Sequence, residues 1–156
     1  MKIDQAIRLD HAIQRDLIEQ LLDTTGDSEE RRGLFKQLKQ ELSIHADAEE
    51  RHFYVPLIEI DRTQEDARHG IAEHHEIDEL VEQVEQTAFD SSGWLKHARN
   101  LADKVLHHLE EEEQDYFPKA DKVLSDEQSE EMGDQYLNAI NDARKTAINH
   151  VGFPWH

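Results

Sequence analysis

The sequence of 156 residues contains no cysteine, and it has only three prolines and six glycines. Without cysteine the chain cannot form disulfides, thiolate metal sites, iron–sulfur clusters or a cysteine nucleophile. Basic residues are also few, because 17 Lys and Arg stand against 36 Asp and Glu and give a formal net charge of −19. This charge repels phosphate, so the composition argues against a nucleic-acid partner.

Long apolar runs are missing as well. No stretch approaches the roughly 18 apolar residues of a membrane-spanning helix. The first eight residues, MKIDQAIR, carry charges where a secretory signal would be apolar. We therefore expect no membrane partner and a cytoplasmic protein. The length suits a single domain with a substantial core.

Apolar residues recur with the period of a helix throughout most of the chain. The pattern predicts helices over about residues 4–23, from a capping box at Asp27 and Glu30 to near Pro56, over 64–86, and over 94–116. Phe117 and Pro118 are expected to end the last of these. Four amphipathic helices of about 20 residues with short connections predict an all-α, up-down-up-down four-helix bundle.

An additional C-terminal helix is predicted from a capping box at Ser125 and Gln128 to about residue 147. Its apolar positions are sparse, which indicates packing on the outside of the bundle; they are Met132, Tyr136, Leu137 and Ile140. The last six residues are aromatic for a chain end, so we expect them to dock, and a homodimer contact through them stays open. The sequence therefore divides into a bundle at 1–120 and a helix with its tail, packed on it, at 121–156.

Two segments with similar sequences, 45–56 and 107–118, stand out among the eleven histidines. Each places a histidine four residues before a glutamate and then continues through an aromatic pair to a proline. Residues four apart lie on one face of a helix, so both side chains can reach one point. An imidazole and a carboxylate that converge in this way suit iron, zinc or manganese.

The spacing alone is weak evidence, since His-x3-Glu begins at five positions: His45, His69, His75, His107 and His108. The helix face distinguishes among them. The pairs beginning at His45 and His108 lie on or beside the apolar stripe of their helices, whereas the pair beginning at His107 points away. A gap-free alignment of the two segments by their prolines instead pairs His45 with His107. We follow the face criterion, because a ligand must point into the bundle.

The first and third helices each place one histidine on the apolar face, His11 and His74. Burying several imidazoles and carboxylates without partners would be strongly destabilising. One inward histidine from each helix therefore predicts a shared metal centre. The candidate metal ligands are His11, His45, Glu49, His74, His108 and Glu112.

In order and spacing these motifs resemble the hemerythrin-like, or HHE cation-binding, family. The resemblance covers most of residues 8–120 and rests on Asp10-His11, His45-x3-Glu49-Glu50, Glu73-His74 and His107-His108-x3-Glu112-Glu113 followed by Tyr-Phe-Pro-Lys. It implies a four-helix bundle with two iron ions joined by an oxo or hydroxo bridge, for which zinc or manganese can substitute. It also implies that the four histidines are terminal ligands and that Glu49 and Glu112 bridge the metals.

The chain departs from the oxygen-carrying hemerythrins on its third helix, where Asp78 replaces the second histidine of a His-x3-His motif. The implied ligands then leave about two of about twelve octahedral positions open, unless His52, His75 or Asp78 fills them. Such a centre suits binding or sensing of O2, peroxide, NO or azide, or iron handling, better than reversible oxygen carriage. The sequence assigns no catalytic residue, and any enzymatic activity would be redox chemistry at the metals.

Two other interpretations stay open. A ferritin-like oxidase uses two Glu-x-x-His motifs, of which only Glu49-x-x-His52 is present. A helical bundle that dimerises and binds a single metal opportunistically would also account for the amphipathic helices. Neither the metal nor the physiological ligand follows from the sequence.

Overall fold

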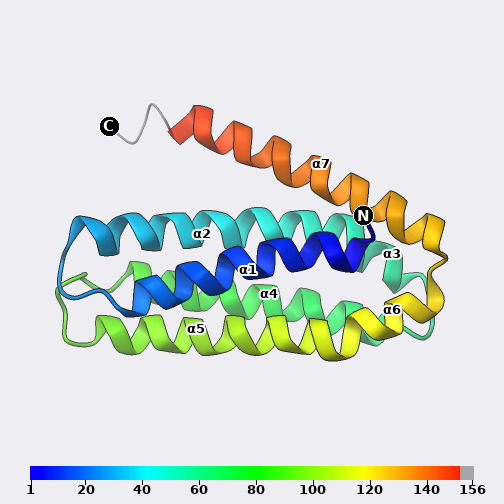
Figure 1. Ribbon diagram of the computed structural model, residues 1–156. Coiled ribbons are helices and arrows are strands. Elements are labelled where there is room, and N and C mark those ends of the chain that lie inside the picture. The colour runs from blue at the N-terminus through cyan, green and yellow to red at the C-terminus, as the bar shows by residue number, and fades with distance from the viewer. Residues whose placement is uncertain (152–156) are drawn as a thin grey trace.

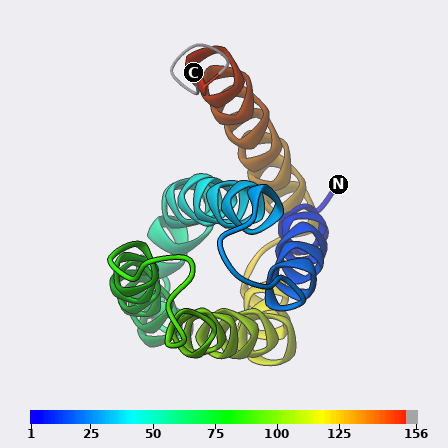
Figure 2. The same ribbon diagram turned by 90° about the vertical axis from the view of Figure 1, so that its left-hand side faces the viewer.

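The computed structural model describes the backbone of residues 1–151 and the side chains of residues 1–147. Four long helices form the bundle, and each runs antiparallel to its neighbours in the chain (Figure 1): α1 (Ile3–Leu22), α2 (Glu29–Glu49), α4 (Gln64–Glu85) and α5 (Trp94–Glu111). Viewed from the end, they form a ring around a common interior (Figure 2). No strand occurs in residues 1–151, and the predicted all-α bundle is confirmed.

The fourth predicted helix continues past the point where it was expected to end, whereas the second ends at Ile58, near Pro56 as predicted. After α2 the chain forms the π-helix η1 (Glu50–Tyr54) and then α3 (Val55–Ile58). After α5 it forms the π-helix η2 (Glu112–Tyr116) and then α6 (Phe117–Val123). The expectation that Phe117 and Pro118 end the helix was therefore wrong. Pro56 and Pro118 each stand in the first turn of a new α-helical segment, where a missing N–H is tolerated.

The start of α2 also differs from the prediction. Ser28, not Asp27, is the capping residue, because its Oγ accepts a hydrogen bond from the backbone N–H of Arg31 at 3.1 Å. Asp27 instead pairs with Arg32 at 2.7 Å. Just before the cap, Gly26 has a φ of 60°, a conformation that favours glycine, and this allows the tight turn from α1.

The helix α7 (Asp126–Val151) lies across α1 and α2 and projects away from the ring at its far end (Figures 1 and 2). The predicted capping box is confirmed, since Ser125 and Gln128 exchange hydrogen bonds of 2.8 and 3.1 Å. Of its predicted packing residues, Tyr136 and Ile140 are fully buried. The docking predicted for the tail lies outside the described residues, and the division at residue 120 stays a prediction.

Two apolar clusters fill the bundle. One lies toward the loops that join α1 to α2 and α4 to α5, and includes Leu38, Trp94 and Leu101. The other lies where η1, η2 and α7 meet, and includes Phe53 and Tyr136. Along each of the four long helices, buried polar residues stand between the positions of the two clusters.

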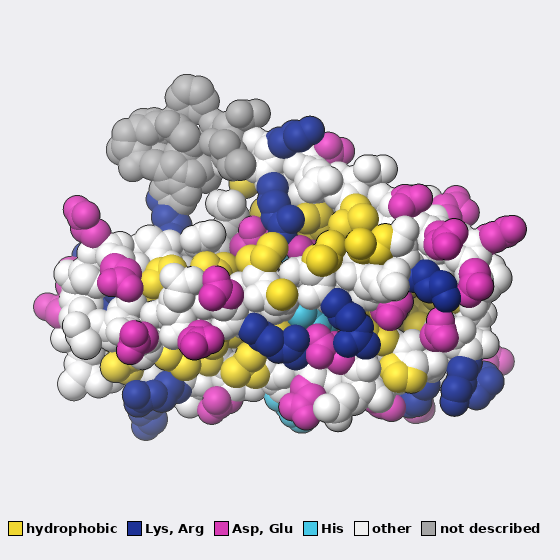
Figure 3. Space-filling model, viewed as in Figure 1, with side chains coloured by type: hydrophobic (Ala, Val, Ile, Leu, Met, Phe, Trp, Pro, Cys, Tyr) yellow, Lys and Arg dark blue, Asp and Glu magenta, His cyan; other side chains and the backbone are white. Residues whose placement is uncertain are grey.

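The surface carries the excess of acidic residues. Figure 3 shows Asp and Glu side chains spread over the visible face, with Lys and Arg among them. Within the described part of the chain, no helix has both the length and the apolar character that crossing a membrane requires.

Candidate metal centre

A layer of buried polar side chains crosses the bundle between the two apolar clusters. It contains all six predicted ligand residues, and each is at most 4% exposed: His11, His45, Glu49, His74, His108 and Glu112. Their ligand atoms form two groups in which all atoms lie within 4.8 Å of one another. One group joins the histidines of α1 and α2 with both glutamates, and the other joins the histidines of α4 and α5 with Glu49.

The Glu49 carboxylate faces both pairs of histidines. Its Oε2 lies 3.3 Å from Nε2 of His45. Its Oε1 lies 2.9 Å from Nε2 of His74 and 3.7 Å from Nε2 of His108. The two oxygens of one carboxylate thus point toward two different positions.

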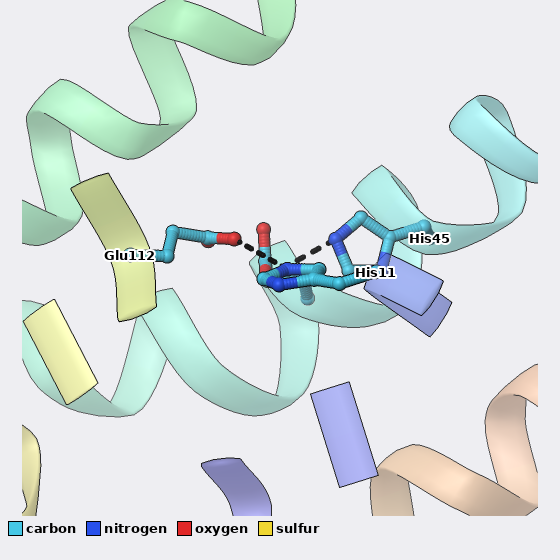
Figure 4. A group of neighbouring side chains, drawn as sticks. His11, His45 and Glu112 are labelled. Carbon is cyan, nitrogen blue, oxygen red and sulfur yellow. Dashed lines mark hydrogen bonds and ion pairs between the residues drawn. The ribbon is translucent and has the colours of Figure 1, made fainter. Parts of the chain in front are cut away.

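Glu112 repeats this arrangement from the opposite side of the bundle. Its Oε1 lies 2.9 Å from Nε2 of His11 (Figure 4), and its Oε2 lies 3.5 Å from Nε2 of His108. Each glutamate therefore turns one oxygen toward the His11 and His45 pair and the other toward the His74 and His108 pair. Two adjacent cations bridged by two carboxylates would use this set of donors.

Several atoms of this layer are buried without a hydrogen-bond partner: Nε2 of His45, Nε2 of His108, Oε2 of Glu49 and Nδ1 of His74. The Nδ1 of His74 lies 3.7 Å from Glu50, too far for a hydrogen bond. Unpartnered buried polar atoms are costly and rare. The three atoms that face the bridging region are those that metal ions would satisfy. Nitrogen and oxygen donors without thiolate suit iron, manganese or zinc, so the residues fit the predicted metal pair.

Carboxylates accept hydrogen bonds from Nδ1 of two of the histidines, on the side of the ring opposite Nε2. The Nδ1 of His11 donates to Glu113 at 2.6 Å, and Glu113 in turn accepts two hydrogen bonds from Arg15 at 2.8 and 3.0 Å. The Nδ1 of His108 donates to Glu73 at 2.8 Å. Such bonds fix the tautomer and the ring orientation, and leave Nε2 free to bind a metal.

The corresponding partner of His45 comes from α7. The Nδ1 of His45 donates to the hydroxyl of Tyr136 at 2.7 Å, and Tyr136 donates to Asp10. Burial and the Asp10 carboxylate hold the pKa of Tyr136 well above its ordinary value, so its hydroxyl keeps its proton. Arg144, also on α7, donates to Asp10 at 2.7 Å.

The sequence analysis gave Glu73 and Glu113 no supporting role. Glu73 is 1% exposed and accepts a hydrogen bond from His108. Glu113 accepts a hydrogen bond from His11. The available signal was their position, because each is the immediate sequence neighbour of a predicted ligand.

Tyr54 makes the two halves of the layer unequal. Its hydroxyl donates to Oε2 of Glu112, the oxygen that faces the His74 and His108 pair. Its ring packs against His74 with centroids 5.7 Å apart. Four residues form the group around His11 and three form the group around His74, and Glu112 belongs only to the first group.

The structure decides the register of the two similar segments. His107 is exposed whereas His108 is buried, as the face criterion predicted. His75 and Asp78, considered as additional ligands, are exposed, and His52 is partly exposed. None of these three belongs to a group of potential metal ligands found among the described side chains.

A small cavity adjoins the layer on the side of the α1–α2 loop. Three candidate ligands, His45, His74 and His108, line it. It leaves about 10 Å³ for the centre of a water-sized molecule, about the minimum that one water needs. Only a very small molecule fits between these histidines and the core.

The fold and the site together define a helical bundle with a buried layer of histidine and glutamate that could hold metal ions. The chain matches the hemerythrin HHE cation binding domain over residues 2–120, and it belongs to this family. The crystal structure of a hemerythrin HHE cation binding domain-containing protein from Mycobacterium kansasii has the same fold. With 22% sequence identity and a TM-score of 0.87, the match covers 98% of this chain and 93% of that one.

A curated relative, named a DNA nickase, comes from Nostoc sp.. It is 29% identical over 139 residues, which make up 89% of this chain but 39% of the relative. The chain thus spans about two fifths of the length of that protein.

Proposed function

We propose that this chain is a non-haem di-iron protein that binds small molecules at its metal pair, with O2, peroxide and NO as the ligand class. The observation that carries the proposal is the double bridge, in which Glu49 and Glu112 each direct one oxygen to each histidine pair. We further propose an oxo or hydroxo bridge between the irons. Zinc or manganese could replace iron, because histidine and carboxylate sites accept all three.

The number of donors supports room for an added ligand. Four imidazoles and two bridging carboxylates supply about eight of the about twelve positions of two octahedral metals, and a solvent-derived bridge brings this to about ten. Bound iron would supply redox chemistry. The chain itself would set the metal separation through its two glutamates, orient the imidazoles through their Nδ1 bonds, and exclude bulk water with the apolar clusters on both sides.

DNA nicking is not transferred from the Nostoc relative. That name belongs to a protein of which this chain spans 39%. A net charge of −19 opposes the approach of duplex DNA. Nor does a purely structural bundle account for the buried, unpartnered atoms of His45, His108 and Glu49.

The test is metal content after expression with iron, measured by elemental analysis together with the visible absorption spectrum. We expect about two irons per chain, as the two groups of ligand atoms imply. His45→Ala should lose metal, whereas His107→Ala, which changes an exposed neighbour of a ligand, should retain both ions. A colourless protein with one zinc, or none, would contradict the proposal.

A further inference from the structure

The layer next to the histidines has one residue from each helix of the bundle. Gln14, Leu42, Ile77 and Val105 all line the small cavity, and each is three positions from the ligand histidine of its own helix. Three of these residues are aliphatic, as expected at the edge of an apolar cluster. Gln14 is the exception, although it is only 1% exposed.

The amide of Gln14 has no protein partner for its nitrogen, which is fully buried. Burying a primary amide without a hydrogen bond is unfavourable, and an aliphatic side chain at this position would avoid the loss. Because Gln14 lines a cavity shared with His45, His74 and His108, that cavity is the place where a partner for its amide can bind.

We infer that Gln14 donates a hydrogen bond to a small molecule held in this cavity and thereby determines which ligand binds. The inference rests on the proposed function and places the ligand beside His45, His74 and His108, which line the cavity. The cavity leaves about 10 Å³ for the centre of a water-sized molecule, about the minimum that one water needs, so the ligand must be very small.

The charge where the cavity reaches the surface narrows the class of ligand further. Ala46 and Asp78 are the lining residues that reach the surface, and Asp78 is exposed. Its carboxylate, within a chain of net charge −19, disfavours the entry of anions. The aliphatic walls also solvate a charge poorly. The ligand class is therefore a very small neutral molecule that accepts a hydrogen bond, such as O2, NO or hydrogen peroxide.

The first experiment uses the iron-loaded full chain with NO as the probe. Gln14→Leu and Gln14→Met remove the donor and keep similar bulk, and Gln20→Met is the matched control on the exposed side of α1. We expect NO to dissociate about tenfold faster from both Gln14 variants, the effect of one hydrogen bond of ordinary strength. The N–O stretching frequency should shift in these variants and stay unchanged in the control.

The outcomes separate the two proposals. Unchanged dissociation rates and frequencies in both Gln14 variants, with NO bound normally to the wild type, would overturn the role of Gln14 and leave the proposed function standing. Failure of the iron-loaded wild type to bind NO or any other small ligand would overturn the proposed function itself. Iron content is measured for each variant, and the amount of NO bound is expressed per iron, so that a loss of metal does not imitate a loss of the hydrogen bond.

The preference for neutral ligands is tested with azide. Asp78→Asn removes the carboxylate at the mouth, so the ratio of azide affinity to NO affinity should rise severalfold at low salt. The increase should diminish at high ionic strength, where the charge is screened. An unchanged ratio at low salt would overturn the selection by charge.

Discussion

Tyr136 accepts a hydrogen bond of 2.7 Å from Nδ1 of His45, a residue 91 positions away in the sequence. Tyr136 lies on α7, beyond residue 120, where the match to the family domain ends. The Tyr136 hydroxyl in turn donates a hydrogen bond to Asp10, and Arg144 of the same helix also donates to Asp10. A helix outside the family domain thus supports a candidate ligand of the metal pair.

Replacing Tyr136 by Phe should weaken metal binding at the His11 and His45 position. Nδ1 of His45 would lose its acceptor, and changes to such outer contacts typically lower metal affinity by about 10- to 100-fold. Iron removal by a chelator measures the effect. Tyr116→Phe is the control, because the hydroxyl of Tyr116 contacts Glu111 and no candidate ligand. Equal iron retention by the Tyr136 variant and the wild type would contradict the assigned role.

Glu49→Gln should remove metal from the protein, whereas the adjacent change Glu50→Gln should not. Glu49 faces both histidine pairs, but Glu50 stays 3.7 Å from His74 and is partly exposed. Elemental analysis gives metal per chain. Because a metal that binds only the folded state raises the melting temperature, iron should stabilise the Glu50 variant but hardly the Glu49 variant. A Glu49 variant that keeps two irons would argue against the bridge.

Gly70→Ala should lower the free energy of unfolding by about 1–3 kcal/mol, the usual effect of overpacking. A Cβ at this position would overlap the ring of Tyr54, which is fixed between Glu112 and His74. Gly33→Ala is the opposite case, since nothing lies within 4 Å of the added carbon and Gly33 is exposed, near the start of α2. There we expect a gain of about 0.5–1 kcal/mol from helix propensity. Denaturant unfolding of both variants checks the pair.

The metal-free protein should become less stable as the pH rises from about 6.5 to about 10. Burial lowers the pKa of His108, but Glu112 and the other nearby carboxylates outweigh it and raise this pKa from 6.5 to about 10. The folded state therefore binds this proton more tightly than the unfolded state. The resulting stability is fully present below pH 6.5 and is lost as the pH approaches 10.

Melting temperatures of the metal-free protein across this range test the effect. His108→Gln should flatten the decline, because the titrating group is gone. Metal must displace the same proton, so apparent metal affinity should rise with pH over this range. A metal-free wild type that gains stability between pH 6.5 and 10 would show that the proton is not held as inferred.

Some local features could be predicted and others could not. The Ser125 and Gln128 box was visible because a capping box depends on residues three apart. The continuation of the helix through Pro118 was not, because the π-helical turn before it has no sequence signature comparable to the proline itself. The sequence also could not show whether Asp27 or Ser28 caps α2, because both residue types are good N-caps.

The sequence was enough to predict the helices, the bundle and the inward direction of His11, His45, His74 and His108, because these follow from a periodicity that each helix carries alone. The contacts across the bundle became visible only in the folded protein. The contacts of Tyr136 with His45, of Glu73 with His108 and of Tyr54 with Glu112 join different helices. Which residues of two helices come into contact depends on the rotation and depth at which the helices pack. That packing depends on all the interdigitating side chains together.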